Sequence, residues 1–249
     1  MNNQINFKIY ANNYDKHRKA DLRLIDLIIN NLNADQKARI LDFGCGTGNY
    51  LNALQKKGYI NLCGLDKSDD MSKIASEKTG VTIKTGSHFN IPYENNYFEG
   101  IILIDVIHFI PDIDLLFKEL NRIAKNDGRI FIATQSHQQL ETRIYSKYFP
   151  STTEIDKLRH HEISKIISNA VLNGFTFVST NDFLKNTDFL VDEEYLNLIK
   201  NKSFYILGLI SEEEFCSGIE KLHLDLQNGN FVSKFPGRTI ITLEKNRKL

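Results

Sequence analysis

Apolar residues in the first half of the chain form short runs, separated by longer segments in which they recur every three or four positions. The short runs are typical of buried strands, and the longer segments are typical of amphipathic helices. Strands are therefore predicted at 40–43, 60–65, 81–85, 98–107 and 130–134, with helices at 21–32, 50–58, 113–124 and from 68 onward. Asp21 is the expected N-cap of the first of these helices. This alternation predicts an α/β fold with a doubly wound, mostly parallel sheet.

The second half of the chain has a less regular pattern. A helix is predicted at 155–173, closed by Gly174, and further strands at 175–183 and 238–244. The residues between these two strands, 184–236, are too many for a bare loop. Helical patterns at 191–200 and 211–227, the second with Ser211 and Glu214 as a capping box, indicate a small helical lid inserted over the cleft. This lid would select substrates and exclude water.

A glycine-rich turn follows the first strand and leads into a helix. Gly44, Gly46 and Gly48 stand at every second position, and the first of them is two residues after Asp42. Glycine lets the backbone turn sharply and approach a ligand closely, and a helix start offers free N–H groups. The dinucleotide fingerprint G-x-G-x-x-G would need a glycine where Asn49 stands. Asp42 would repel a pyrophosphate but would suit an ammonium group, so the turn predicts a different nucleotide pocket.

The second predicted strand ends at Asp66. In nucleotide-binding α/β folds, an acidic residue at this place accepts hydrogen bonds from a ribose diol. Asp66 could instead be only the N-cap of the helix that follows, but Ser68 is the better capping residue. We therefore expect Asp66 to be available to a ligand.

These motifs, taken in order, resemble the class I S-adenosylmethionine-dependent methyltransferases of the small-molecule type. The D-x-G-x-G-x-G run starting at Asp42 resembles their first motif, the segment from Tyr10 to Asp15 their Y-x-x-x-Y-D opening, and the segment from Asp66 to Met71 their D-x-S-x-x-M run. The resemblance covers residues 10 to 135, and it implies an antiparallel edge hairpin formed by the last two strands. The cofactor-binding residues it implies are Tyr10, Tyr14, Arg18, Asp42, Gly44, Cys45, Gly46, Gly48, Asp66, Lys67, Met71, Gly86, Ser87, His88, Phe89, Ile104 and Val106.

One position departs from the family pattern. Many relatives carry an aspartate after the glycine at 86, where it accepts a hydrogen bond from the adenine amino group, but this chain has Ser87. A serine accepts one hydrogen bond and contributes no charge. Adenine recognition is therefore expected to depend more on the backbone amides of His88 and Phe89.

A catalytic base is needed if the acceptor is a weakly acidic hydroxyl, whereas an amine or carboxylate can do without one. His108, which resembles the histidine that many relatives carry after the fourth strand, is one candidate. Tyr10, Tyr14 and His137 are the others. The residues alone do not choose among them, and each could instead be structural.

Composition excludes several classes. The 249 residues hold 31 basic and 31 acidic side chains, so no basic excess indicates a nucleic-acid partner. Three scattered cysteines show no metal-binding spacing and suggest reduced thiols. No apolar run suits a membrane span or a secretory signal, so a cytoplasmic protein is expected, as a monomer or homodimer. We expect one domain over 1–249, with a core at 36–183 and 237–249, cap helices within 1–35 and the lid at 184–236.

The predicted function is transfer of a methyl group from S-adenosyl-L-methionine to an O, N or C atom of a small molecule, with S-adenosyl-L-homocysteine as product and no metal. The in-line displacement needs mainly positioning and desolvation. Two alternatives stay open. One is a non-catalytic S-adenosylmethionine-binding regulatory protein, which would bind the cofactor without turnover. The other is a nicotinamide-dependent oxidoreductase, which Asp42 and Asn49 disfavour.

Overall fold

The computed structural model describes residues 19–247, which divide into two compact units. The first unit consists of residues 19–134, 164–180 and 240–247, and the second consists of residues 135–163 and 181–239. Both units are therefore assembled from segments that are far apart in the sequence.

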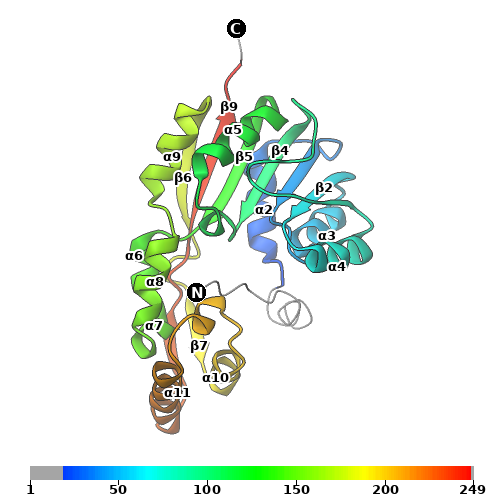
Figure 1. The fold of residues 1–249 in the computed structure, drawn as a ribbon. Helices are drawn as coiled ribbons and strands as arrows, with labels where there is room; N and C mark the ends of the chain where they lie inside the picture. Colours follow the sequence, from blue (N-terminus) through cyan, green and yellow to red (C-terminus); the bar gives the residue numbers. More distant parts are fainter. Residues whose placement is uncertain (1–18, 248–249) are drawn as a thin grey trace. The chain divides into compact units, whose positions relative to one another are not determined.

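A seven-stranded sheet is the centre of the first unit, with strand order β3-β2-β1-β4-β5-β9-β6 (Figure 1). Its strands are β1 (Arg39–Phe43), β2 (Asn61–Asp66), β3 (Thr82–Thr85), β4 (Phe98–Ile104), β5 (Ala124–Thr134), β6 (Phe175–Phe183) and β9 (Arg238–Lys245). The pairs β1–β2, β1–β4, β2–β3 and β4–β5 are all parallel. The predicted doubly wound, mostly parallel fold is thus confirmed, with β6 and β9 as neighbours at one edge.

The strands β1 and β4 lie inside the sheet, and their burial matches this position. Residues 40–43 and 100–104 are all buried, as expected for strands covered on both faces. Strand β5 begins at Ala124 rather than at residue 130, so the predicted strand is only its second half. The buried strand interiors supply the core that holds the strand ends in place.

Six helical segments belong mainly to this unit. They are α2 (Leu22–Leu32), α3 (Asn49–Lys56), α4 (Asp69–Thr79), the 3₁₀ turn η1 (Ile107–Phe109), α5 (Ile113–Ile123) and α9 (Ile163–Leu172). The side chain of Asp21 accepts a hydrogen bond from the Arg23 amide at the start of α2, and Ser68 caps α4 in the same manner through Met71. Both predicted N-caps are confirmed.

The second unit contains α6 (His137–Glu141), α7 (Ile144–Tyr148), α8 (Ser151–Arg159), α10 (Glu193–Lys200), the 3₁₀ turn η2 (Tyr205–Gly208) and α11 (Glu212–Gln227). It also contains a two-stranded antiparallel sheet, β7 (Asp188–Val191) with β8 (Phe231–Lys234). The expected helices α10 and α11 are present, but the segment 184–236 is not purely helical. The side chains of Phe189, Val191 and Phe231 pack on the unit's apolar cluster, which holds this pair of strands in place.

The prediction of one helix over 155–173 is wrong. The helix α8 ends at Arg159, and His160 adopts an extended backbone conformation with φ −83° and ψ 125°. The His160 ring nitrogen Nδ1 lies 2.9 Å from the carbonyl oxygen of Asp156, which is one of the terminal carbonyls of α8. This interaction ends the helix at a position where the apolar pattern alone would continue it.

Candidate functional site

The glycine turn predicted from the sequence lies between β1 and α3. Gly44, Gly46 and Gly48 all have positive φ, at 75°, 53° and 79°, a region that favours glycine. The amides of Gly44 and Cys45 both donate to the Leu65 carbonyl, at 2.7 and 3.0 Å. The turn is therefore fastened to the carboxyl end of β2, as a pocket at this edge of the sheet requires.

The turn also lies close to the end of β4. A Cβ atom added at Gly44 would come within 2.3 Å of Cγ2 of Val106, so no larger residue fits there. At the start of α3, Gly48 offers no side-chain cap. The N-terminus of α3, with the positive end of the helix dipole, therefore begins directly at the glycine turn.

Asp66 connects the turn to the next helix. Its Oδ2 accepts a hydrogen bond from the Gly46 amide at 2.9 Å, and its Oδ1 accepts one from the Ser68 amide at 2.9 Å. Burial raises the pKa of this carboxyl, and the two backbone donors together with Lys67 oppose the rise. A carboxylate has about four acceptor positions, so two positions are left for a pair of ligand hydroxyls.

Asp42 lies near the end of β1 and is only 2% exposed. Its Oδ2 atom is buried and has no hydrogen-bond partner. Burial raises the pKa of this carboxyl to about 8, and the nearby negative charge of Asp66 contributes to the rise. A buried acceptor without a donor costs free energy. An ammonium group nearby would donate the missing hydrogen bond and offset the repulsion between the two carboxyl groups.

The segment expected to meet adenine follows β3. The Gly86 amide donates to the Asp66 backbone carbonyl at 3.1 Å, and Ser87 and Asn90 form an isolated antiparallel bridge. The Phe89 side chain is 63% exposed, and its ring contacts that of His88 edge to face, with centroids 5.2 Å apart. Burial lowers the pKa of His88, with Asp112 opposing, which favours the neutral imidazole.

At the carboxyl end of β4, Ile104 is buried and Val106 is half-buried. His108 lies in η1, with its ring centroid 4.2 Å from that of Phe109, and the Lys67 ammonium lies 5.7 Å from the Phe109 ring. The ends of β2 and β4 thus bring these side chains together. One residue at this strand end that we did not predict is Asp105, whose φ of 51° lies in the left-handed region that aspartate adopts more readily than most residues.

Two residues of α4 fix this helix against the core and the glycine turn. Met71, a predicted cofactor residue, is 4% exposed on α4, so it packs from that helix into the core. Lys78, at the other end of α4, donates from Nζ to the Thr47 carbonyl at 3.1 Å and to Asn49 Oδ1 at 2.6 Å. The helix α4 is therefore hydrogen-bonded to the end of the glycine turn through Lys78.

The remaining predicted site residues are not brought to this place by any described contact. Tyr10, Tyr14 and Arg18 lie outside the described residues. His137 belongs to the second unit, where its Nε2 lies 2.8 Å from the His160 carbonyl oxygen. Their roles stay predictions, as do those of the other site residues.

Taken together, the first unit offers two carboxyl groups at adjacent strand ends and a glycine turn tied to one of them. Asp42 lacks a donor and Asp66 has spare acceptor positions. These features fit a ligand that carries an amine and a ribose diol, which are the polar groups of an S-adenosyl nucleoside. The fold and the site together define the class I methyltransferase type.

Comparison with known proteins identifies the family. A family model described as "Methyltransferase domain" matches residues 14–180, so the chain belongs to the methyltransferase domain family. A demethylmenaquinone methyltransferase of Staphylococcus haemolyticus is 29% identical over 120 residues, which is 45% of this chain and 50% of that protein. An uncharacterized protein of Methanocaldococcus jannaschii is 28% identical over 190 residues, 73% of each chain. This chain spans about half the length of the demethylmenaquinone methyltransferases that it matches.

Solved structures share the fold. A protein of Anabaena variabilis, described as a candidate methyltransferase of an antibiotic biosynthesis pathway, superposes with a TM-score of 0.75 at 24% identity, covering 90% of this chain and 98% of that chain. The geranyl diphosphate C-methyltransferase of Streptomyces coelicolor, solved with S-adenosyl-L-homocysteine, has a TM-score of 0.61 at 15% identity, covering 90% and 78%. At these identities, the likeness establishes the fold alone.

No helix among residues 19–247 is both long and apolar enough to cross a lipid bilayer.

Proposed function

We propose that this chain binds S-adenosyl-L-methionine where β1 and β2 end and transfers its methyl group to an O, N or C atom of a small molecule, releasing S-adenosyl-L-homocysteine. The observation that carries the proposal is the 2.9 Å hydrogen bond from the Gly46 amide to Asp66 Oδ2. It fixes a carboxylate beside a glycine turn, in the family that the matching methyltransferase domain defines.

We assign a candidate partner to each of the cofactor's polar groups that meets the strand ends. Asp66 would accept from the ribose hydroxyls while it keeps its two backbone donors. Asp42 would meet the ammonium group, and the amides at the start of α3 would meet the carboxylate end. The segment of Ser87, His88 and Phe89 would contact adenine, with Ser87 accepting at most a neutral hydrogen bond.

The bound cofactor supplies a methyl group that is already activated by a sulfonium. The chain's own contribution is therefore to position the acceptor and to exclude water. His108, at the end of β4, is our first candidate to accept a proton from a hydroxyl acceptor, with Tyr14 and His137 as the others. An amine acceptor that is already neutral needs no such base.

The wider setting is also proposed. We expect a single methyltransferase domain, with a lid at 184–236 that selects the acceptor, and a cytoplasmic monomer or homodimer without a nucleic-acid partner. The balance of 31 basic and 31 acidic side chains supports a small, non-polymeric acceptor.

Titration calorimetry with S-adenosyl-L-homocysteine and with NAD tests the cofactor. Binding of the first alone supports the proposal, and binding of NAD alone would replace it with an oxidoreductase. Gly46→Val is the control, because a branched side chain at φ 53° is strained and blocks the turn. Mass spectrometry of a metabolite extract incubated with methyl-labelled cofactor then tests turnover. Cofactor binding without any labelled product would indicate the non-catalytic regulatory alternative.

A further inference from the structure

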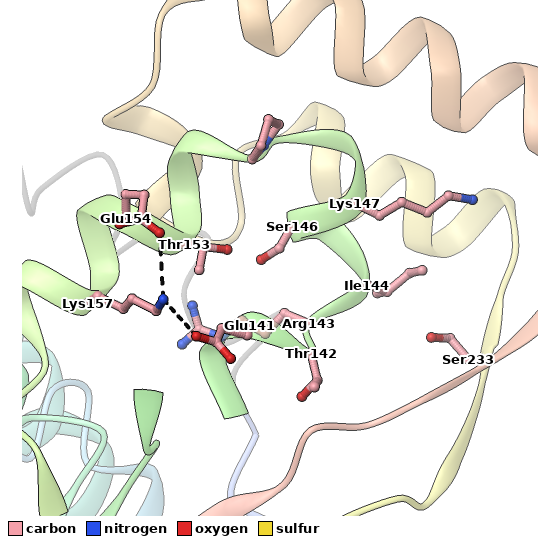
Figure 2. A pocket seen from close by; sticks show the side chains of 11 residues that line it. Glu141, Thr142, Arg143, Ile144, Ser146, Lys147, Thr153, Glu154, Lys157 and Ser233 are labelled. Atoms are coloured by element: carbon pink, nitrogen blue, oxygen red, sulfur yellow. Dashed lines mark ion pairs between the residues drawn. The ribbon is translucent and has the colours of Figure 1, made fainter. Parts of the chain in front are cut away.

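Acidic side chains of this chain differ in whether a positive charge accompanies them. In the second unit, the Asp156 side chain is only 5% exposed, and it forms an ion pair with Arg143. On the wall of a surface hollow of about 470 Å³ in the same unit, Lys157 pairs with Glu141 and Glu154, at 2.7 and 3.6 Å (Figure 2). In both places, each negative charge has a positive charge beside it.

Asp42 in the first unit is the contrary case. It is only 2% exposed, its Oδ2 atom has no hydrogen-bond partner, and no positive charge within residues 19–247 offsets its burial. Its neighbours in the sheet, Gly64 on β2 and Ile102 on β4, carry no charge. A carboxyl group in such surroundings holds a proton, because the ionised form would be neither hydrated nor paired.

The titratable groups around Asp42 do not supply the missing positive charge. Burial and then the negative charge of Asp66, at the end of the adjacent strand, raise the pKa of Asp42 to about 8. The Cys45 thiol stays neutral, because burial raises its pKa and both carboxyl groups add to the rise. Burial also raises the pKa of Asp66, and Lys67 is among the groups that oppose this second rise. In the ligand-free chain at neutral pH, Asp42 is therefore mostly protonated.

We propose that Asp42 gives up its proton to the solvent when S-adenosyl-L-methionine binds, and that the resulting carboxylate pairs with the cofactor's ammonium group. The O–H bond of the carboxyl group breaks, its electron pair stays on the oxygen, and the ammonium group keeps its own three protons. A charge-assisted hydrogen bond then takes the place of a buried neutral group without a donor. This inference rests on the proposed function, because it needs the cofactor to bind where β1 and β2 end.

The consequence is a cofactor site whose affinity rises with pH. Below the ligand-free pKa of Asp42, each binding event releases a proton, so a higher proton concentration opposes binding. Above that pKa the carboxyl group is already ionised, and the dependence disappears. With the ligand-free pKa at about 8, the affinity for S-adenosyl-L-homocysteine should rise about ninefold from pH 6 to pH 7 and about fivefold from pH 7 to pH 8.

Titration calorimetry of the full chain with S-adenosyl-L-homocysteine, in phosphate and in Tris buffer at pH 7, counts the released protons. The two buffers take up a proton with very different heats, so the difference between the two binding heats gives the number released. We expect about 0.9 proton for each bound nucleoside. Asp42→Asn has no carboxyl group to ionise, so its binding heats should be equal after correction for nothing but the buffers' own dilution.

The matched ligand control is 5′-methylthioadenosine, which has the same nucleoside and a thioether but no ammonium group. It should bind without releasing a proton, and it decides the matter if Asp42→Asn does not fold. The matched protein control is Asp66→Asn, because Asp66 is the other carboxyl group with a raised pKa at these strand ends. This variant should still release most of a proton with S-adenosyl-L-homocysteine, although it binds more weakly.

Three results would overturn the proposal. They are equal binding heats of the parent in the two buffers, the same proton release with 5′-methylthioadenosine as with S-adenosyl-L-homocysteine, and loss of the release in Asp66→Asn. In each of them the nucleoside still binds, so the proposed function is left standing. Absence of binding by either nucleoside at both pH 7 and pH 8 would instead refute the cofactor site itself, and the proton release with it.

Discussion

Replacing Asp42 by asparagine should make the ligand-free chain more stable at neutral pH. The carboxyl of Asp42 is buried, lacks a partner for Oδ2 and has its pKa raised from 3.8 to about 8 by burial and by Asp66. In the unfolded chain this group ionises near its ordinary pKa. The folded state therefore holds a proton that the unfolded state releases between about pH 4 and pH 8.

The size of the effect follows from this difference. Below pH 3.8 both states are protonated, and Asp42 causes no pH dependence. As the pH rises, the unfolded state gains about 1.4 kcal/mol per pH unit relative to the folded state, until the folded carboxyl also ionises near pH 8. At pH 7 the free energy of unfolding should thus be about 4 kcal/mol below its acid limit because of this residue. Asparagine keeps the size of the side chain but has no group that ionises in this pH range.

Urea unfolding followed by circular dichroism, at pH 5, 6, 7 and 8, measures the effect. The free energy of unfolding of Asp42→Asn minus that of the parent should increase with pH, by about 2–3 kcal/mol between pH 5 and pH 7. A constant offset is expected from the new amide and does not affect this slope. A difference that stays the same across the four pH values would refute a raised pKa at Asp42.

Three further predictions concern the same unit. Asp66→Ala should weaken binding of S-adenosyl-L-homocysteine by about 1–3 kcal/mol, with Asp66→Asn losing less, and calorimetric affinities equal to the parent's would contradict its proposed place at the ribose. Gly44→Ala should lower the urea-unfolding free energy more than Gly80→Ala, because both have positive φ but only at Gly44 does the new Cβ meet Val106, at 2.3 Å, while Gly80 faces open space. Equal losses of unfolding free energy in the two variants would mean that the Val106 side chain moves aside at no cost. With an acceptor in hand, His108→Ala should lower kcat by about 100-fold and leave cofactor affinity unchanged, and equal loss of both would remove its place at the acceptor.

The predictable features are those that neighbouring residues determine. Asp21 and Ser68 cap their helices through amides two or three residues away, so sequence alone identified them. The glycine turn and Asp66 were also predicted from local pattern, because strand ends in a parallel sheet meet at one edge. The succession of strands and helices along the chain, and hence the parallel sheet, followed from the alternation of apolar runs.

The features that were missed depend on distant parts of the chain. The pairing of β7 with β8 needs residues 188–191 to meet 231–234, and a local apolar pattern does not show which distant segments pair. The interruption at His160 depends on a ring that bonds back to Asp156. Glu214 was expected to complete a capping box with Ser211. Ser211 does cap α11, but the carboxylate of Glu214 accepts from the Ser151 amide instead.

The candidate site was predicted in the same uneven manner. The sequence indicates that Asp42 follows a strand interior, but its burial without a donor depends on how the sheet is covered. The left-handed backbone of Asp105 was not predicted, because aspartate adopts both ordinary and left-handed conformations. Arg143, Asp156 and Arg159 of the second unit form ion pairs with side chains that are only 5–21% exposed. Their burial was missed because helix periodicity treats charged residues as solvent-facing.

The position of β9 has a consequence for how the chain is synthesised. This strand follows all the other described strands in sequence, yet it lies between β5 and β6 in the sheet. Until the ribosome has made residues 238–245, β5 and β6 each present an unpaired backbone edge, which is a template for association with other chains. Nascent or prematurely ended chains should accordingly need chaperone protection, and a stop codon before Arg238 should yield insoluble protein.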